Sequence, residues 1–533
     1  MPHSPNQLLA TTATSSLLAI FLMACSTKST PLDEGDADRQ PSIDDMGAPD
    51  LDHAVDSAHD LDQEYQGDAD MIPSHDQGAP LIEDLGLHAD APPDRDEGTS
   101  PLPLQGYPCE IDLTHPSPYP EDGAITTTLS GLQPRHGVLL PVPVVHNQDF
   151  GISSSHLGPV ARDYSNRMVF APERHVAYYA GGSHGTYRAN DVWEYHLASN
   201  TWRLRYYPEG GSWGPHKAAI FGLRGWLEDG LELSDEDMQK VEDFKAWAKD
   251  QVVFERGILT TPKGGPIMPS HQWDGFTYDL HARRIIWRAG AHFHFTPKMI
   301  AYLLDLPLAE VEARYDATYS KMWTYDPEQN RWEPYRTQDE ELRERVITGM
   351  ATSAVYIPDR CSTLHYGATP SIYQMWMHDL VSDTWAQILP NGGRQIMGLA
   401  AEGLSPLAEQ QMAYSPQSKK IVAVLKGDTF IYDLASESWS PLPHEPMVEH
   451  AHDARTVFVH DSKNDVFLLI GRDAPDRIHA FSLDTMHWEE ILIQGDPYEP
   501  GAYQRPFGYY DPEHNVIVVG NNKHRTMWAF RYQ

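Results

Sequence analysis

The strongest constraint on the fold is an aromatic pattern that returns along the chain from Asn190 to the last residues. In its first copy, Trp193 is followed two residues later by Tyr195 and nine residues later by Trp202. The same spacing recurs in Trp323, Tyr325 and Trp332; Trp376, His378 and Trp385; Phe430, Tyr432 and Trp439; His479, Phe481 and Trp488; a sixth copy begins at Trp528 and Phe530. Such an internal repeat constrains the fold more than any single window of sequence.

Each copy follows two runs that are typical of β-strands. In the first copy, the run Met168–Gly182 is divided by a turn at Pro172–Arg174, and Trp193 and Tyr195 then lie on one face of a third strand. A fourth strand carries Trp202. Four antiparallel strands make a small sheet that cannot bury both of its faces, and radial stacking of such sheets solves this problem. The sequence therefore predicts an all-β propeller.

The segment Gly181–His196, G-G-S-H-G-T-Y-R-A-N-D-V-W-E-Y-H, resembles the kelch repeat with its glycine doublet and W-x-Y motif. The doublet is degenerate in the later copies, for example Ala289-Gly290, whereas the aromatic spacing is kept. The resemblance covers about residues 137–533 and implies a six-bladed kelch-type β-propeller. It implies no particular chemistry, because a fold of this kind hosts many functions.

The first hundred residues differ sharply from the repeats. Residues 1–25 are interpreted as a lipoprotein signal peptide, because the apolar stretch Leu8–Ala24 is short for a membrane span and Leu22–Cys25 looks like a lipobox. An uncleaved anchor is the alternative. Lipidation of Cys25 would leave Ser26 next to the lipid, which resembles an outer-membrane sorting signal of Gram-negative bacteria. We therefore expect a lipid-anchored protein of the cell envelope, attached to the outer membrane.

Residues 26–104 form an acidic segment with very few aromatic residues. Ser26–Ser100 contains 21 Asp or Glu and three Lys or Arg, so 3 − 21 = −18 of the total formal charge of −36 lies here. Such a segment cannot bury enough apolar surface to offset its chain entropy, so the sequence predicts a disordered acidic linker before a propeller over 105–533. The acidic balance argues against nucleic acid as a partner.

Cysteine usage suits an exported protein. Lipidation of Cys25 leaves Cys109 and Cys361 as one candidate disulfide pair. Cys109 leads into the last blade whereas Cys361 belongs to the third, on the other side of the ring. This placement argues against the bond, and the sequence leaves open whether the two thiols pair.

The repeats are interrupted by three insertions, at residues 206–270, 296–320 and 337–349. The first contains a helix start at Ser234–Asp237, and the second contains two short helical runs separated by Pro307. No further W-x-Y copy occurs in the first insertion, so a seventh blade is not expected. Because strands alternate in direction, all three insertions emerge on one face, which is where binding is expected.

Candidate ligand-binding residues follow from the blade register. Six positions before the turn that joins the first two strands of each blade, the channel entrance carries Trp273, Glu409, Arg455 and Arg505, with Ser165 and Ala351 at the remaining two positions. His184 and His292 share a second register on the rim. A concave mouth with an arginine pair favours a carboxylate-bearing ligand, such as an acidic sugar or an acidic side chain of a protein partner. A purely structural role for both arginines is the alternative.

Motifs for catalysis and cofactors are largely missing. The sequence has no G-x-S-x-G, Walker, H-E-x-x-H or dinucleotide motif, and we expect no cofactor. H-x-H pairs such as His292/His294 and His450/His452 arise by chance among 27 histidines, so we also expect no metal. The sequence favours a monomeric binding or scaffold module for a carbohydrate or protein partner. The alternative is a carbohydrate-active enzyme, such as a sugar mutarotase-like isomerase that uses Glu409 with Arg455 or Arg505.

The last copy of the repeat has no fourth strand of its own between Phe530 and Gln533. Counting back from the first blade by the usual interval reaches the apolar run Gly137–Val145. We therefore predict that Leu139–Val145 pairs beside Trp528–Tyr532 and closes the ring.

Overall fold

The fold is taken from a computed structural model of the 533-residue chain. The repeats lie in a compact unit that spans residues 99–533. The described residues are 109–147, 165–181, 190–209, 217–255, 257–267, 272, 274–288, 295–315, 322–335, 350–369, 372–389, 410–425, 428–443, 456–471, 474–499, 506–521 and 526–533.

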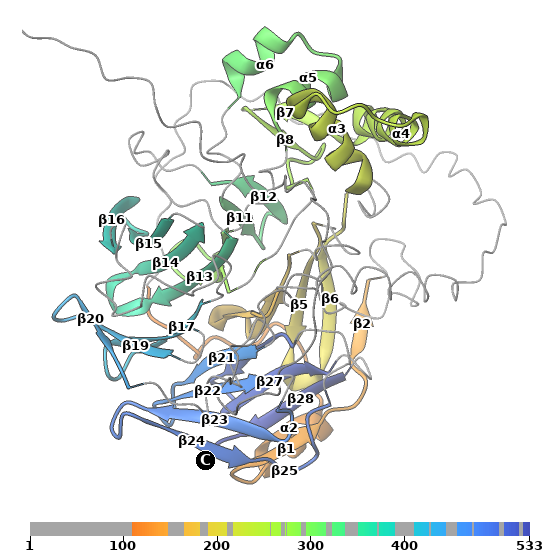
Figure 1. Ribbon diagram of the computed structural model, residues 1–533. Helices are drawn as coiled ribbons and strands as arrows, with labels where there is room; N and C mark the ends of the chain where they lie inside the picture. Colours follow the sequence, from red (N-terminus) through yellow and green to blue (C-terminus); the bar gives the residue numbers. More distant parts are fainter. Residues whose placement is uncertain are drawn as a thin grey trace, which may run out of the picture. The chain divides into compact units, whose positions relative to one another are not determined.

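Six sheets, each with four antiparallel strands, contain the repeats (Figure 1). The first blade is β3 (Val169–Ala171), β4 (Val176–Tyr179), β5 (Val192–His196) and β6 (Thr201–Tyr206); the second is β9 (Phe276–Asp279), β10 (Arg284–Arg288), β11 (Met322–Asp326) and β12 (Arg331–Pro334); the third is β13 (Met350–Ile357), β14 (Ser362–Thr369), β15 (Ile372–Asp379) and β16 (Thr384–Leu389). The fourth is β17 (Gln410–Ser415), β18 (Lys420–Leu425), β19 (Asp428–Asp433) and β20 (Ser438–Pro441); the fifth is β21 (Thr456–Asp461), β22 (Val466–Gly471), β23 (Arg477–Ser482) and β24 (His487–Leu492). The sixth joins β26 (Gly508–Asp511), β27 (Val516–Asn521) and β28 (Thr526–Arg531) to β1 (His136–Leu139), with β25 (Gln494–Gly495) at its edge.

The aromatic spacing has a simple structural cause. The second aromatic of each triplet faces the third across the last two strands of its blade, as in the pairs Tyr195↔Trp202 and Tyr325↔Trp332. Their ring centroids are 4.7 and 5.1 Å apart. A cross-strand aromatic pair stabilises the hairpin to which it belongs. The length of the turn between the two strands therefore fixes the sequence spacing of the two aromatic residues.

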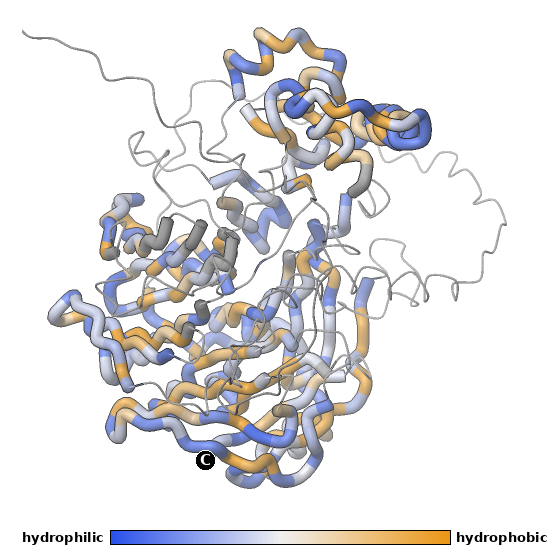
Figure 2. Tube along the Cα trace, viewed as in Figure 1, coloured by the Kyte–Doolittle hydropathy of each residue, from blue (hydrophilic) through white to orange (hydrophobic). Residues whose placement is uncertain are grey.

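Neighbouring blades are held together by separate apolar clusters, one at each of the six blade interfaces. The cluster that contains Tyr195, Trp202, Val518 and Ala529 joins the sixth blade to the first, so the ring is closed. Figure 2 shows the apolar residues concentrated along the strands of the blades. The structure thus confirms a six-bladed β-propeller.

Closure uses a strand from each end of the propeller, but in a register that differs from the prediction. β1 pairs antiparallel with β28 from His136↔Arg531 to Leu139↔Trp528, and the amide of Leu140 donates to the carbonyl oxygen of Met527 at 2.9 Å, so only Leu139 and Leu140 of the predicted range take part. Pro141 and Pro143 cannot donate ladder hydrogen bonds, which ends this strand early. The chain then forms β2 (Val144–His146), which pairs parallel with β6 of the first blade.

Two of the predicted insertions fold together into one helical subdomain. The first contains α3 (Lys217–Asp229), α4 (Asp235–Gln251), β7 (Val253–Glu255) and β8 (Ile258–Thr260), and the second contains α5 (Pro297–Leu304) and α6 (Leu308–Arg314). Their apolar side chains, such as Phe244 and Met299, share a single core. Figure 1 shows the subdomain on one side of the blades. Ser234 caps α4 as predicted, by accepting a hydrogen bond from the Asp237 amide.

The remaining described elements are short. Helix α2 (Gly123–Gly131) is capped by Asp122 and precedes β1, and three 3-10 turns span Pro172–Arg174, Leu197–Ser199 and Pro358–Arg360. Within the described ranges, no helix has the length and apolar character needed to cross a membrane. The third insertion, 337–349, and the N-terminal segment 1–104 lie outside the described residues.

Candidate functional site

The described residues next to the predicted ligand-binding positions form a polar layer across the channel. The predicted residues Trp273, Glu409, Arg455, Arg505, His184 and His292 themselves lie outside the described residues, as does Cys25. The chain neighbours one or two positions after Trp273, Glu409, Arg455 and Arg505 are described. These neighbours were not singled out from the sequence, although they share a register of their own.

Arg167 is the centre of the polar layer. Its Nε lies 2.8 Å from Oδ1 of Asp274 in the second blade, and both side chains are almost fully buried. Nη1 of Arg167 donates to the carbonyl oxygen of Ala354, and Nη2 donates to that of Met412 at 2.5 Å. One side chain from the first blade therefore reaches inner strands of the second, third and fourth blades.

Asp274 is the matching acceptor of the layer. Its Oδ2 accepts hydrogen bonds from Oγ of Ser353 at 2.7 Å and from the amide of Met412 at 3.1 Å. Burial raises the pKa of Asp274 to about 6, while Arg167, Ser353 and Met412 act in the opposite direction. Burial likewise lowers the pKa of Arg167, which Asp274 opposes. The two charges are buried together, and each depends on the other.

The layer continues into the fifth and sixth blades through neutral groups. Nδ2 of Asn166 and Nε2 of Gln411 both donate to the carbonyl oxygen of Thr456, at 3.0 and 2.9 Å. The amide of Gly508 donates to the carbonyl oxygen of Asn166 at 3.0 Å. All six blades therefore contribute to one hydrogen-bonded network in the channel.

Beyond this layer, the channel widens into a cavity of about 240 Å³ on the face that carries the turns between first and second strands. We call it the turn-face cavity; it lies at the opposite end of the channel from the insertions. The next-to-last residue of each first strand has an aromatic ring that lines the cavity: Phe170, Tyr278, Tyr356, Tyr414, His460 and Tyr510. Arg167 and Met412 line it as well, where it meets the polar layer.

The polar atoms of several of these rings are engaged by residues of the turns. Oη of Tyr278 donates to Glu173 of the preceding blade at 2.5 Å, and Tyr414 donates in the same way to Asp359. His460 contacts Asp465 through Nε2 at 2.8 Å. The hydrogen bonds fix each ring, so mainly carbon surface is left to form the wall of the cavity.

Residues 109–122 cross the turn face, and we call this segment the strap. Cys109 and Cys361 form a disulfide with a Cα–Cα distance of 5.2 Å, so the argument from blade position against this bond is wrong. Cys361 ends the first turn of the third blade with φ +48°, and the strap runs from there toward the first blade. Ile111 of the strap lines the turn-face cavity. Chain order was misleading because the strap crosses the ring before it enters the last blade.

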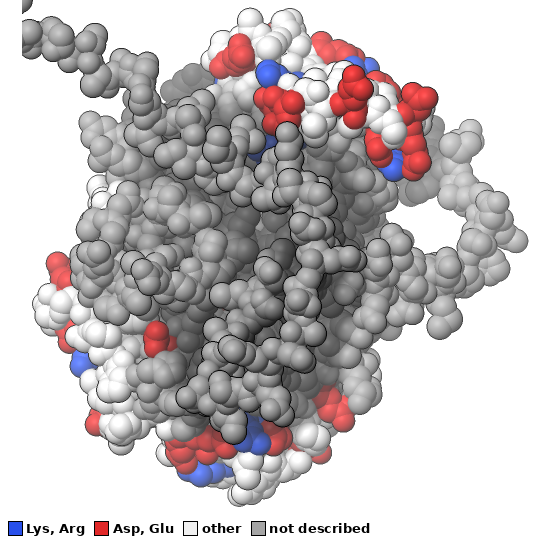
Figure 3. All heavy atoms as spheres, in the orientation of Figure 1, with Lys and Arg blue, Asp and Glu red and all other residues white. Residues whose placement is uncertain are grey.

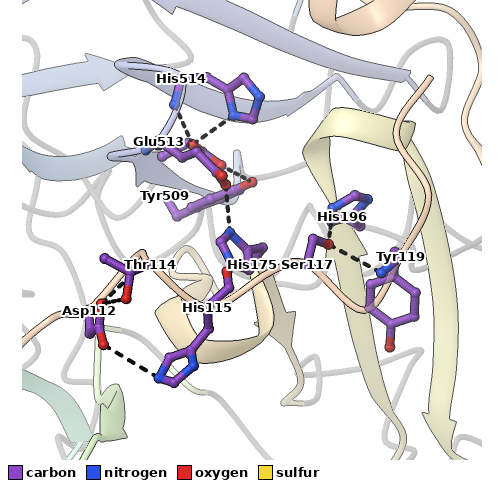
Figure 4. Close-up of polar contacts among 11 residues, drawn as sticks. Asp112, Thr114, His115, Ser117, Tyr119, His175, His196, Tyr509, Glu513 and His514 are labelled. Atoms are coloured by element: carbon purple, nitrogen blue, oxygen red, sulfur yellow. Dashed lines mark hydrogen bonds and ion pairs between the residues drawn. The ribbon is translucent and has the colours of Figure 1, made fainter. Parts of the chain in front are cut away.

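Three histidines of the blades, His175, His196 and His514, lie near the part of the strap that is distant from Cys109 (Figure 4). His175 contacts Oε2 of Glu513 through Nδ1 at 2.8 Å and the carbonyl oxygen of His115 through Nε2. Oγ of Ser117 lies 3.0 Å from Nε2 of His196. Burial lowers the pKa of His196 to about 4, with His175, His514 and Arg203 lowering it further and Asp511 raising it. For His514 burial also lowers the pKa, but Asp511 outweighs this effect and the net shift is upward.

The stability of the propeller should fall with acidification because of His196. Its pKa in the folded chain is about 4 and its ordinary value is 6.5, so unfolded chains take up protons first as the pH falls. The stabilisation is fully present above pH 6.5 and is lost toward pH 4, on the order of 1–3 kcal/mol. Chemical denaturation at pH 7 and pH 4 measures this loss. The His196→Gln variant should show a smaller difference, and an equal difference would contradict the assignment.

Two clusters of metal-binding residue types occur among the described residues. The first is Cys109, His281 and Cys361, and the second is Asp511, Glu513 and His514. Both sulfur atoms of the first cluster are used in the disulfide. In the second, Oδ1 of Asp511 already accepts hydrogen bonds from the amides of Glu513 and His514. Neither arrangement supplies a set of ligands that is ready for a metal ion.

The disulfide should contribute to stability. Replacing Cys109 and Cys361 with serine together is expected to lower the free energy of unfolding by about 2–4 kcal/mol, because the bond closes a long loop. Chemical denaturation of the parent and the double variant measures the difference. Mass spectrometry of a non-reduced digest tests the bond itself, and two free thiols in exported protein would contradict it.

Comparisons with known proteins add little to this geometry. No protein-family model matches the chain, and no curated protein matches it in sequence. Two solved structures that show limited similarity to this chain are described as auxiliary nutrient binding proteins, one from Bacteroides ovatus and one from Bacteroides thetaiotaomicron. They share 8% and 9% identity with this chain, cover 74% of it and 76% and 75% of their own length, and have TM-scores of 0.37. A likeness of this size says nothing about ligand or function.

Proposed function

We propose that this chain is an exported binding module, tethered to the cell envelope by a lipid on Cys25, that recognises a ligand or partner on its insertion-bearing face. The observation that carries the proposal is the helical subdomain. Two insertions, from different connections of the propeller, pack into one core that is distinct from the clusters between the blades. The ring closes without this second core. We therefore assign the helical subdomain a role in recognition.

The exposed surface of the subdomain supports a role in contact with a partner. Phe221 and Leu231 expose 47% and 57% of their surface, although both are large apolar residues. Helix α4 adds exposed acidic residues, among them Glu236, Asp243 and Asp250, and Figure 3 shows acidic side chains across the subdomain. Apolar side chains surrounded by charged ones are typical of surfaces that bind other molecules.

The kelch resemblance and the residues Trp273, Glu409, Arg455, Arg505, His184 and His292 belong to this proposal. The polar layer supports this assignment because Arg167 and Asp274 form an ion pair with each other, so Arg167 is not free to bind a carboxylate of a ligand. Charge for binding a carboxylate would therefore come from Arg455 and Arg505, one position before Thr456 and two before Phe507. A carbohydrate or a protein with exposed carboxylates is the class of ligand that we expect.

A binding screen tests the proposal. Soluble protein spanning residues 105–533 is screened against glycans and envelope proteins, and each hit is measured again with Arg455→Ala plus Arg505→Ala and with Phe221→Glu. The proposal expects at least a tenfold loss of affinity in one variant, with an unchanged melting temperature. Val381→Ala, an exposed change in the turn between β15 and β16 and outside the helical subdomain, serves as control. Equal affinity in all variants would contradict recognition by this face.

The lipid anchor has its own test. Cys25→Ser is expected to shift the full-length protein from the membrane fraction to the soluble fraction of exported material, because the proposed site of lipidation is removed. Fractionation with immunoblotting measures the distribution. Ser26→Ala is the matched control, and membrane retention of the Cys25→Ser protein would contradict lipid anchoring.

A further inference from the structure

We infer that the turn-face cavity is a second binding site, which takes a small apolar molecule with one or two rings. It lies at the opposite end of the channel from the insertions and does not depend on the function proposed above. The inference rests on the shape of the cavity, the chemistry of its wall and the position of the strap.

The cavity is a pocket with a closed floor. Arg167 fills the channel at its inner end, where it bonds to Asp274, Ala354 and Met412. A molecule that enters from the turn face therefore cannot pass through the ring. The volume of about 240 Å³ exceeds the roughly 150 Å³ of an engineered apolar cavity that binds benzene. It suits a one- or two-ring molecule.

The wall selects apolar molecules over polar ones. Phe276, Val355 and Phe458 present carbon surface, and the hydroxyl groups of Tyr278 and Tyr414 are held by Glu173 and Asp359. A sugar that entered would give up hydrogen bonds to water along a wall whose tyrosine hydroxyls already donate to Glu173 and Asp359. An apolar ring would instead be removed from water against the carbon surface of Phe276, Val355 and Phe458. The balance favours an aromatic or alicyclic ligand.

The strap places a side chain at the entrance. Ile111 lines the cavity and is 49% exposed, so it covers part of the mouth and still faces solvent. Oη of Tyr356, another cavity residue, donates to the carbonyl oxygen of Cys109 at 2.8 Å, and the disulfide holds Cys109 in place. The entrance is therefore a fixed part of the folded propeller.

The experiment uses naphthalene as the probe and glucose as its polar counterpart, with the oxidised 105–533 protein. Calorimetry is expected to show saturable binding of one naphthalene per chain and no binding of glucose. Val459→Trp adds an indole to the wall and should weaken naphthalene binding at least tenfold. Val381→Trp is the matched control, because Val381 is 62% exposed and lies outside the cavity lining.

The melting temperature of each variant shows whether the variant folds and can be used in the binding measurement. If Val459→Trp fails to fold, Ile111→Trp takes its place, because Ile111 is half exposed and its enlargement narrows only the entrance. Equal binding by the blocking and control variants, or no saturable binding by the parent, would overturn the inference. Arg455→Ala with Arg505→Ala should leave naphthalene binding unchanged, so failure of this site and failure of the insertion-face site give different results.

Discussion

Deletion of residues 137–146 is expected to abolish cooperative unfolding of the propeller. The deleted segment contains most of β1 and all of β2, which complete the sixth blade and extend the first. Its loss exposes the edge of β28 and opens the apolar clusters that contain Leu139, Leu140 and Trp528. Because a domain of ordinary stability has only about 5–15 kcal/mol in total, an open ring of this kind should not persist. Thermal and chemical denaturation measure the loss.

The control for this deletion removes residues 26–104, which precede the described part of the chain. That protein should melt like the parent. A deletion of 137–146 that melts cooperatively at the parent temperature would show that the strand from the N-terminal side does not close the ring.

A point substitution tests the same closure without removing a strand. Gly137 lies opposite Phe530, where the other blades have a tryptophan, and the indole of Trp528 covers it. A Cβ at this position would collide with that indole and with the carbonyl oxygen of Asp496, so Gly137→Ala should lower the melting temperature clearly. Gly131→Ala is the control, because a Cβ there meets nothing within 4 Å.

The features that could be predicted from the sequence are those fixed by local structure. The aromatic pair Tyr195↔Trp202 spans one tight turn, so its spacing reports both the strands and their register. Helix α4 begins at Ser234 because the capping signal lies within a few residues. The closing strand could be predicted from its apolar run, but it ends earlier than predicted, because Pro141 and Pro143 have no amide N–H to donate to the ladder.

The features that could not be predicted depend on chain segments that are distant in sequence. The disulfide was missed because the path of the strap across the turn face is set by contacts such as those of Tyr356 with Cys109 and His175 with His115. The polar layer was missed because Arg167, Asp274 and Met412 meet only when the ring closes. The residues predicted for the ligand site remain a prediction.

Asp274→Ala is expected to destabilise the propeller by about 3–5 kcal/mol, because it leaves the buried guanidinium of Arg167 without its counter-ion. Removing Oδ2 also leaves Ser353 and the amide of Met412 without their acceptor. Denaturant unfolding measures the change. Asp279→Ala is a useful comparison, because Asp279 is also buried but faces the partly exposed Arg284 at 3.3 Å, so its loss should cost less.

The double variant Asp274→Ala with Arg167→Met separates the cost of an unpaired charge from the value of the pair itself. Met preserves much of the length of the arginine side chain and needs no partner, so the double variant should recover part of the stability that Asp274→Ala loses. A double variant as unstable as the sum of the two single variants would mean that the ion pair is not the coupling element. The contacts of Arg167 with the carbonyl oxygens of Ala354 and Met412 would then carry the stability of the layer.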